Sequence, residues 1–440
     1  MFIAVDDTDS RSGNCTTYLA TEIVRSLKGH DLIGNPKLVR LNPAVPWKTR
    51  GNASIVLRIG IGAGEKKKIG EIGGKDIFCY EKSSGEPDAE KLLDSIVPVV
   101  MANRESDAES GVIVSSVKPD KSFYKLGVQT ILTLDPIRKE AERINAKIFT
   151  MDTGIGLIGA LCGMAWEPGD STYELLAYRK KERWGTERLV KSETIRLMDS
   201  KFTGTFNSWE ERHQKVTMVP STPCPVLYGI RGDIEEELPS AHTTIVSEGA
   251  DRWIIFLTNQ GTDDHIITDA KELVPDQSYL IKGTVAENAR RLKGGHVFMN
   301  IDTEYGKITC GAYEPSKEFR MLFDNLLPGD TIEAIGELRE EPRTLNVEKV
   351  HVTSVIKAEK KVSNPICPKC DGRMKSIGKG QGYRCRKCHT KSKEPEMKMQ
   401  SRSVVPGWYE PPAAARRHLS KPLKRMHTEQ PVEFVNQRSE

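Results

Sequence analysis

Three aspartates follow a short apolar run at the start of the sequence. Residues 2–10 read FIAVDDTDS, so a segment typical of a β-strand ends in Asp6, Asp7 and Asp9. Carboxylates gathered at the end of a strand commonly hold Mg²⁺ against the phosphates of a nucleotide, because Mg²⁺ takes oxygen ligands. Asp is also frequent in solvated turns and at helix N-caps. The spacing by itself leaves both interpretations open.

Two further segments have side chains that suit phosphate binding. Lys48 and Arg50 lie in a KTRGN loop between strands expected over 37–41 and 53–59. Cations and backbone N–H groups in such a loop can face phosphates, although a basic surface turn explains the loop as well. Asp152 lies in MDTGIGLIGAL, a glycine-rich turn that opens an apolar helix. A helix N-terminus can bind phosphate, but the spacing matches no nucleotide fingerprint, and packing through small residues is the alternative.

A third segment, TPCPVLYGIRG, predicts a strand over 226–230 that ends in Arg231 and Gly232. An arginine and a glycine at a strand end can contact a phosphate or a base. Both residues are therefore weaker candidates for nucleotide contact.

Four cysteines near the C-terminus have the spacing of a zinc site. Cys367 and Cys370 are separated by two residues, as are Cys385 and Cys388, and fourteen residues lie between the pairs. Four thiolates complete a tetrahedral site with no open position, so the Zn²⁺ expected here is structural. Basic side chains and Tyr383 decorate the same segment, which indicates a surface for nucleic acid.

The elements that must position these residues divide the chain into several domains, because 440 residues are too many for one core. Strands and helices alternate at first, whereas five short strands over 278–356, with a helix before the fourth, fit a small OB-type barrel. Such barrels often bind single-stranded nucleic acid, and some serve only as spacers. The fold class predicted is multidomain α/β and α+β, with units at 1–195, 196–272, 273–360 and 361–395 and a basic tail at 396–440.

Charge is distributed unevenly over the chain. The net charge is +4, but residues 361–440 alone carry 18 Lys and Arg against 7 Asp and Glu, so the other 360 residues are net negative. This pattern favours a polyanionic partner bound mainly near the C-terminus, although a disordered basic tail would look the same. With no apolar run of membrane-spanning length, no basic leader and mostly scattered cysteines, we expect a cytoplasmic protein without a disulfide framework or membrane contact.

Several motifs occur here in one order: IAVDDTDSRSGNCTTYLA, RLNPAVPWKTRGN, MDTGIGLIGAL, CPVLYGIRG, the barrel and the four-cysteine segment. In this set, to about residue 395, the chain resembles the archaeal tRNA-Ile 2-agmatinylcytidine synthetase family. The resemblance implies a kinase-like catalytic domain, a ferredoxin-like domain, an OB-fold barrel and a zinc ribbon. It also implies a ligase that uses ATP and agmatine to convert the wobble cytidine of the CAU-anticodon tRNA-Ile into 2-agmatinylcytidine, releasing AMP and phosphate.

The expected chemistry assigns roles to the candidate residues. Phosphorylation of the cytosine 2-oxo group would create a leaving group that an amine can displace, so phosphate charge must be neutralised. The three aspartates are then Mg²⁺ ligands or a general base, and Lys48 and Arg50 stabilise transition-state charge. The residues expected to contact the nucleotide are Asp7, Lys48, Arg50, Asp152, Arg231 and Gly232.

The resemblance also raises Thr16 as a phosphoacceptor, since the family's kinase-type domain is thought to phosphorylate a threonine; the alternative is a plain hydroxyl at a helix N-terminus. The agmatine pocket is not assigned to residues, and no obligate protein partner is evident. The competing function is a non-catalytic nucleic-acid-binding protein with a barrel and a zinc ribbon. Three carboxylates facing a polyanion disfavour it, because they repel phosphate unless a metal lies between.

Overall fold

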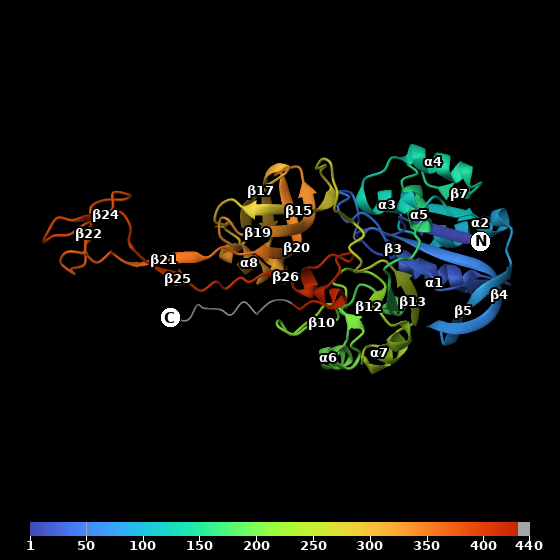
Figure 1. Ribbon diagram of the computed structural model, residues 1–440. Coiled ribbons are helices and arrows are strands. Elements are labelled where there is room, and N and C mark those ends of the chain that lie inside the picture. The colour runs from blue at the N-terminus through green and yellow to red at the C-terminus, as the bar shows by residue number, and fades with distance from the viewer. Residues whose placement is uncertain (50, 430–440) are drawn as a thin grey trace.

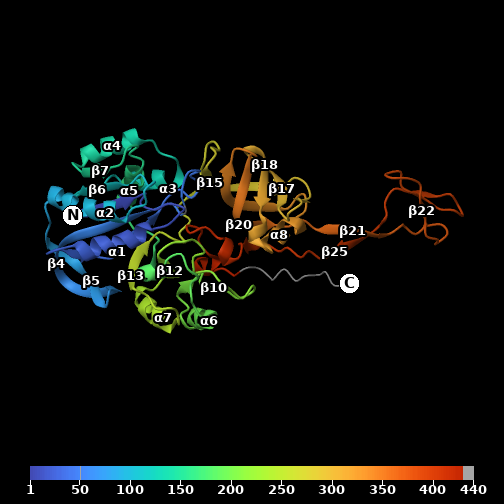
Figure 2. The same cartoon turned by 180° about the vertical axis from the view of Figure 1, so that it is seen from behind.

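The computed structural model describes residues 1–49 and 51–429 and shows three parts arranged in a row. Figure 1 shows an α/β body at one end, a barrel in the middle and a thin ribbon at the far end. Figure 2, from behind, shows the same order. Within the described ranges no helix is both long and apolar enough to cross a bilayer.

One eleven-stranded sheet forms the α/β body. Its strands are β1 (Phe2–Asp6), β2 (Asp31–Ile33), β3 (Lys37–Arg40), β4 (Ala53–Ile72), β5 (Lys75–Gly85), β6 (Gly111–Ser115), β7 (Lys147–Thr150), β8 (Thr172–Tyr178), β9 (Thr205–Phe206), β12 (Val226–Gly232) and β13 (Arg252–Thr258). The hydrogen-bonded order is β7-β6-β1-β4-β3-β13-β8-β12-β9, and β2 and β5 pair with β4. Strand β4 is far longer than the expected 53–59, because a turn at Gly73 and Gly74, both with positive φ, folds β5 back onto it.

Helices cover both faces of the first half of this sheet. They are α1 (Thr16–Ser26), α2 (Ala89–Asn103), α3 (Ser122–Gln129), α4 (Leu134–Arg143) and α5 (Gly156–Met164). Alternation along β1 separates the two cores, since Ile3 and Val5 pack with α1 and α2 whereas Ala4 packs with α4 and α5. Apolar Leu92, Ile96 and Val100 recur at helical spacing in the sequence and form the buried face of α2, and its N-cap carboxylate, Asp88, accepts from the N–H groups of Glu90 and Lys91.

The second half of the body continues the same sheet. Strand β13 runs parallel to β3 and antiparallel to β8, and β8 pairs in turn with β12. Helices α6 (Ser192–Lys201) and α7 (Leu238–Thr244) cover this half, together with the short strands β10 (Trp209–Glu210) and β11 (Lys215–Val216). The sheet therefore passes without a break across the boundary that the sequence suggested near residue 195.

Five strands close into the barrel. They are β15 (Gln277–Val285), β17 (Val297–Thr303), β18 (Gly306–Ala312), β19 (Thr331–Arg339) and β20 (Thr344–Ser354), with β14 (Ile266–Ile267) and β16 (Arg290–Arg291) at the periphery. Pairing of β15 with β17 and of β18 with β20 completes the closure. Helix α8 (Phe319–Asn325) precedes the fourth barrel strand and packs Leu322 and Phe323 into the core, so the five strands and the helix expected from the sequence are confirmed.

The ribbon stands on a two-stranded stalk. Strands β21 (Ala358–Ser363) and β25 (Glu396–Gln400) pair antiparallel, and beyond them β22 (Lys375–Ser376), β23 (Tyr383–Arg384) and β24 (Lys391–Ser392) form a small sheet. Figures 1 and 2 both show the ribbon extended away from the barrel.

The C-terminal segment, residues 401–428, folds back from the stalk to the body. Its strand β26 (Gly407–Tyr409) joins β20 on the barrel, and the 3₁₀ turns Ala413–Ala415 and Leu423–Met426 follow. Figure 1 shows this segment, in red, at the junction of the barrel and the body. The sequence had predicted only a basic tail at 396–440.

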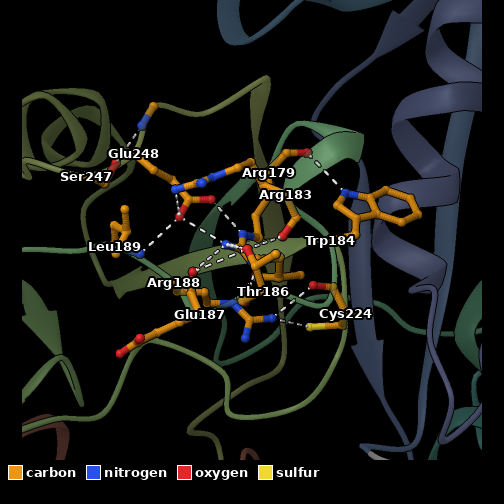
Figure 3. A network of polar contacts seen from close by, with 12 residues as sticks. Arg179, Arg183, Trp184, Thr186, Glu187, Arg188, Leu189, Cys224, Ser247 and Glu248 are labelled. Atoms are coloured by element: carbon orange, nitrogen blue, oxygen red, sulfur yellow. Dashed lines mark hydrogen bonds and ion pairs between the residues drawn. The ribbon is translucent and has the colours of Figure 1, made fainter.

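A buried polar network fixes one wall of the body (Figure 3). Arg179 forms a double contact with Glu248, at 2.6 and 3.0 Å, and both side chains are almost fully buried. Arg188 donates to the carbonyl oxygens of Thr222, Cys224 and Val226. These bonds hold the segment that leads into β12 against the loop that follows β8.

Replacing Arg179 should destabilise the body strongly. Arg179→Ala removes the bidentate partner of the buried Glu248 carboxylate and leaves only the more distant Arg183, at 3.8 Å, so we expect a loss of about 3 kcal/mol in the free energy of unfolding, measured with urea. The control is Arg196→Ala, whose ion pair with Glu211 is exposed and should contribute less than about 1 kcal/mol. Equal losses in the two variants would contradict this interpretation.

Candidate catalytic cleft

A cleft of about 1020 Å³ opens where the two halves of the body and the C-terminal segment meet. Its lining includes Asp6, Asp7 and Asp9, Thr16, Lys48 and Arg231, so the structure brings most of the candidate residues together. Arg50 lies outside the described residues. Trp47 also lines the cleft, with 59% of its surface exposed.

The acidic side of the cleft is the end of β1 and the loop after it. Asp7 adopts a left-handed conformation, with φ 53°, which Asp tolerates better than most residues. Ser110 donates to the carbonyl oxygen of Asp7 at 2.8 Å, and the N–H of Glu105 donates to Thr8, so the loop is tied to the segment before β6. Thr49 donates to the carboxylate of Asp9 at 3.1 Å. These hydrogen bonds fix the conformation of the loop that carries Asp7 and Asp9 at the cleft.

The environment opposes ionisation of two of these aspartates. Burial, together with the charge of Asp7, holds the pKa of Asp6 well above its ordinary value. Burial and then the charge of Asp9 raise the pKa of Asp7 to about 6. A cation placed among the carboxylates would relieve both effects, because it favours the charged forms.

The glycines of α5 serve packing, which answers a question that the sequence left open. An added Cβ on Gly159 would lie 1.5 Å from an Asp6 carboxylate oxygen, and one on Gly156 would lie 2.4 Å from the backbone of Gly111. The helix thus approaches β1 and β6 closely, and Gly159 makes room for the carboxylate. Thr153, Ile155 and Gly159 from this segment line the cleft.

Two candidates lie beside the cleft but not in its lining. Asp152 is exposed in the turn before α5, whereas its neighbour Thr153 lines the cleft. Gly232 ends β12, where an added Cβ would meet Leu238 at 3.1 Å. The structure therefore shows a packing role for Gly232.

Lys48 and Thr16 occupy different sides of the cleft. Lys48 donates to the carbonyl oxygen of Pro43, and burial, followed by the charge of Arg417, lowers its pKa. Thr16 begins α1, is nearly buried, and accepts from the Thr8 hydroxyl at 3.1 Å. The neighbouring Thr17 lines the cleft as well. Both interpretations of Thr16 stay open.

The cleft also contains a hydrogen-bonded cluster that the sequence did not reveal. Its members are Arg40, Gln260, Glu174, Arg231 and His418. Buried Glu174 accepts from Arg231 at 3.0 Å and from Gln260 at 2.5 Å. Gln260 also accepts from Arg40, at 3.3 Å, and Arg231 contacts His418 at 2.9 Å.

These residues come from separate parts of the chain, so no local motif joins them. Arg40 ends β3, Gln260 lies shortly after the paired strand β13, and Glu174 stands on β8. The one available signal was the RLNPAV motif that contains Arg40; His418 had none.

The donor sets at the two acidic or thiol-rich places suit different metals. Within residues 1–49 and 51–429, three or more ligand atoms of Cys, His, Asp or Glu come within 4.8 Å of one another only at the cysteines Cys367, Cys370, Cys385 and Cys388. Four such thiols fit a closed zinc site. The aspartates of the cleft are spread more widely, which suits Mg²⁺, since that ion is held by one or two carboxylates with phosphate and water completing its shell.

An acidic cleft in an α/β body, joined to a closed barrel and a four-cysteine ribbon, defines a multidomain enzyme of nucleic-acid modification. The family models for the TiaS TCKD domain, the TiaS FLD domain and the TiaS C-terminal zinc ribbon domain match residues 2–153, 154–265 and 364–404. The isoleucine-tRNA 2-agmatinylcytidine synthetase TiaS of Archaeoglobus fulgidus is 38% identical over 443 residues, covering 98% of each sequence. The chain belongs to the family of tRNA-Ile 2-agmatinylcytidine synthetases, as the sequence motifs predicted.

Solved structures agree over nearly the whole length. The complex of TiaS with its isoleucine tRNA and ATP superimposes with a TM-score of 0.85 at 35% identity, covering 98% of this chain and 99% of the other. The complex of TiaS with the same tRNA, AMPCPP and agmatine has a TM-score of 0.83 at 32% identity, with the same coverage. The multidomain fold expected from the sequence is therefore confirmed at this level.

Removing the charge of Asp7 should stabilise the metal-free protein in a pH-dependent way. Because the pKa of Asp7 is raised from 3.8 to about 6 on folding, the folded protein binds this proton more tightly, and stability falls as the pH rises through this range. In EDTA, Asp7→Asn should gain about 1–2 kcal/mol at pH 7.5, a value reduced for solvent screening. The gain should shrink as the pH is lowered to 4, as followed by urea denaturation; a gain independent of pH would mean that the backbone conformation, not the charge, is responsible.

Proposed function

We propose that this chain is an ATP-dependent ligase that conjugates agmatine to the 2-position of the wobble cytidine of tRNA-Ile with a CAU anticodon. The observation that carries the proposal is the cleft itself, where carboxylates suited to Mg²⁺–ATP face a cluster of guanidinium groups. The likeness to complexes that contain the isoleucine tRNA, ATP and agmatine supports the substrates.

The two reactants must meet in this cleft. Cytosine's 2-oxo group is a poor leaving group, so it is first phosphorylated by the γ-phosphate of ATP, which leaves ADP, and the amine of agmatine then displaces inorganic phosphate from C2. Formation of AMP requires in addition that water cleave this ADP to AMP and a second phosphate. Both steps concentrate negative charge on phosphoryl oxygens, and catalysis depends on positioning and on neutralising that charge. Lys48 and Arg231 are the side chains proposed to neutralise this charge. Arg50, in the same sequence motif as Lys48, is proposed for the same role.

Asp6, Asp7 and Asp9 are the residues that would hold Mg²⁺, with Asp7 or Asp9 available as a base. Mg²⁺, when bound, would neutralise the phosphates and let the carboxylates share a site with a polyanion. Asp152, beside the α5 N-terminus, stays a proposed nucleotide contact, and Gly232 a weaker one. Thr16 is the proposed phosphoacceptor, which phosphopeptide mass spectrometry after incubation with ATP would show.

The domains divide the work on a large substrate. Residues 1–195 are proposed to act as a kinase-like catalytic domain, 196–272 as a ferredoxin-like domain, 273–360 as an OB-fold and 361–395 as the zinc ribbon. The wobble base is unpaired in its loop, so it enters the cleft at little cost. The barrel and the basic ribbon would hold the tRNA body and acceptor end, at a distance that only an elongated protein can span.

The ligase is tested directly by incubating the protein with CAU-anticodon tRNA, labelled agmatine and Mg²⁺–ATP. Label in the tRNA with AMP formed is the expected result. Asp7→Ala should reduce turnover by at least about 100-fold with tRNA affinity nearly unchanged, since the lost interaction is made at the reacting phosphates. A wild type that binds tRNA but is inactive would favour the non-catalytic alternative. Loss of tRNA binding in Asp7→Ala would show that the aspartates have a structural role.

Zinc should be needed for tRNA binding and not for the chemical steps. Cys385→Ser is expected to lose the metal, measured by elemental analysis, and to weaken tRNA binding at least about tenfold, because the ribbon cannot fold without it. His389→Asn is the matched control: it follows the last cysteine, has positive φ that Asn tolerates, and should retain zinc. Normal tRNA affinity in metal-free Cys385→Ser would exclude the ribbon from binding.

A further inference from the structure

The C-terminal segment is anchored to the body on both sides of His418. The N–H of Gly261 donates to the carbonyl of His418, and the N–H of Asp263 donates to Leu419, each at 2.8 Å. Further along, Lys421 and Arg425 both pair with Asp170 at 2.7 Å. Backbone bonds and ion pairs thus fix the position of His418, although it follows the zinc ribbon in sequence.

The hydrogen bond between Arg231 and His418 determines which ring nitrogen carries the proton. Arg231 has only donors, so Nδ1 of His418 accepts from it at 2.9 Å, and Nε2 carries the hydrogen in the neutral ring. The ring lies over the loop that contains Gly51, where an added Cβ would lie 3.4 Å from Nε2. His418 lines the cleft and is exposed there, so its Nε2–H is available to a ligand.

The groups around this N–H favour an anionic oxygen. The cluster contains two guanidinium groups, Arg40 and Arg231, and one buried carboxylate, Glu174, which leaves positive charge beside the ring. The charges of Arg40 and Arg231 also lower the pKa of His418, so the ring is neutral in the ligand-free protein. A neutral N–H between two guanidinium groups is a site for a phosphoryl oxygen.

We infer that His418 is a binding residue of the catalytic cleft, donating its Nε2–H to a phosphoryl oxygen, and that the C-terminal segment is part of the catalytic site. The inference rests on the proposed function for the identity of the reaction. The oxygen belongs either to ATP or to the phosphorylated cytosine, and the two sources are separable by experiment.

Three variants separate direct contact from positioning of Arg231. Asn at position 418 can place an oxygen where Nδ1 lies and keep the bond to Arg231, but it cannot reach the ligand. Gln can place an amide N–H near Nε2. We expect His418→Ala and His418→Asn to lower kcat/KM for agmatinylation about 100-fold, and His418→Gln to stay within about tenfold of wild type.

The matched control is His427→Ala, an exposed histidine of the same segment, which should behave as wild type. Rescue by Asn but not by Gln would overturn the inference and make His418 only a positioning residue for Arg231. Wild-type activity in all three variants would overturn it as well. Melting temperature and zinc content, measured on each variant, show whether the fold is kept.

Calorimetric titration with Mg²⁺–ATP in the absence of tRNA identifies the source of the oxygen. About tenfold weaker ATP binding in His418→Ala assigns it to ATP, and unchanged ATP binding with lost turnover assigns it to the cytosine phosphate. If the wild type binds ATP but transfers no agmatine, the proposed function fails. In that case the role of His418 is still tested by ATP affinity, and unchanged ATP binding in His418→Ala would overturn the inference.

Discussion

The parallel pairing of β3 with β13 is the contact on which the cleft depends. It joins Lys37 to Leu257 and Leu38 to Thr258, and together with the pairing of β4 and β13 it connects the two halves of the sheet. Just beyond it, the side chain of Asn259 bonds to both the N–H and the carbonyl of Arg40, extending the pairing with an amide where the strands diverge. Arg40 and Gln260 are thereby brought to one edge, facing the end of β1. Without this junction, Arg40 would be separated from Gln260 and Glu174.

Charge in the cleft is only partly neutralised by ion pairs, because Glu174 pairs with Arg231 whereas further carboxylates gather at the end of β1. Carboxylates gather at the end of β1, where burial and mutual repulsion raise the pKa values of Asp6 and Asp7. Guanidinium groups gather at the ends of β3 and β12. Such an arrangement costs folding free energy in the isolated protein, and a ligand that carries both phosphates and a divalent cation relieves it. The site is thus preorganised for a ligand that combines phosphates with a divalent cation.

Local pattern predicted the parts of this structure that local forces determine. Apolar spacing located α2, five short strand-like runs located the barrel, and cysteine spacing located the ribbon. The loops with Asp6 to Asp9 and with Lys48 were found for the same reason, because each is a short motif.

What escaped prediction depends on contacts between distant residues. The exposed lysines of β4 hid its extension to Ile72, which exists because β5 and β13 pair with it. Glycines in α5 suggested either phosphate or packing, and only the position of Asp6 distinguishes them. His418 stands 187 residues from Arg231, in a basic stretch without a motif, and its role follows from chain reversal after the ribbon.

The paired stalk has a topological consequence. Because Ala358 pairs with Gln400 at one end of the stalk and Ser363 with Glu396 at the other, the chain leaves the barrel and returns to it at the same place. The ribbon is therefore an inserted module with adjacent ends, although it lies between the barrel and the segment that reaches the cleft. The length and surface of the ribbon can change, or the ribbon can be replaced by another module, without moving β25 or the C-terminal segment that follows it. Substrate capture and chemistry can thus evolve at different rates within one continuous polypeptide.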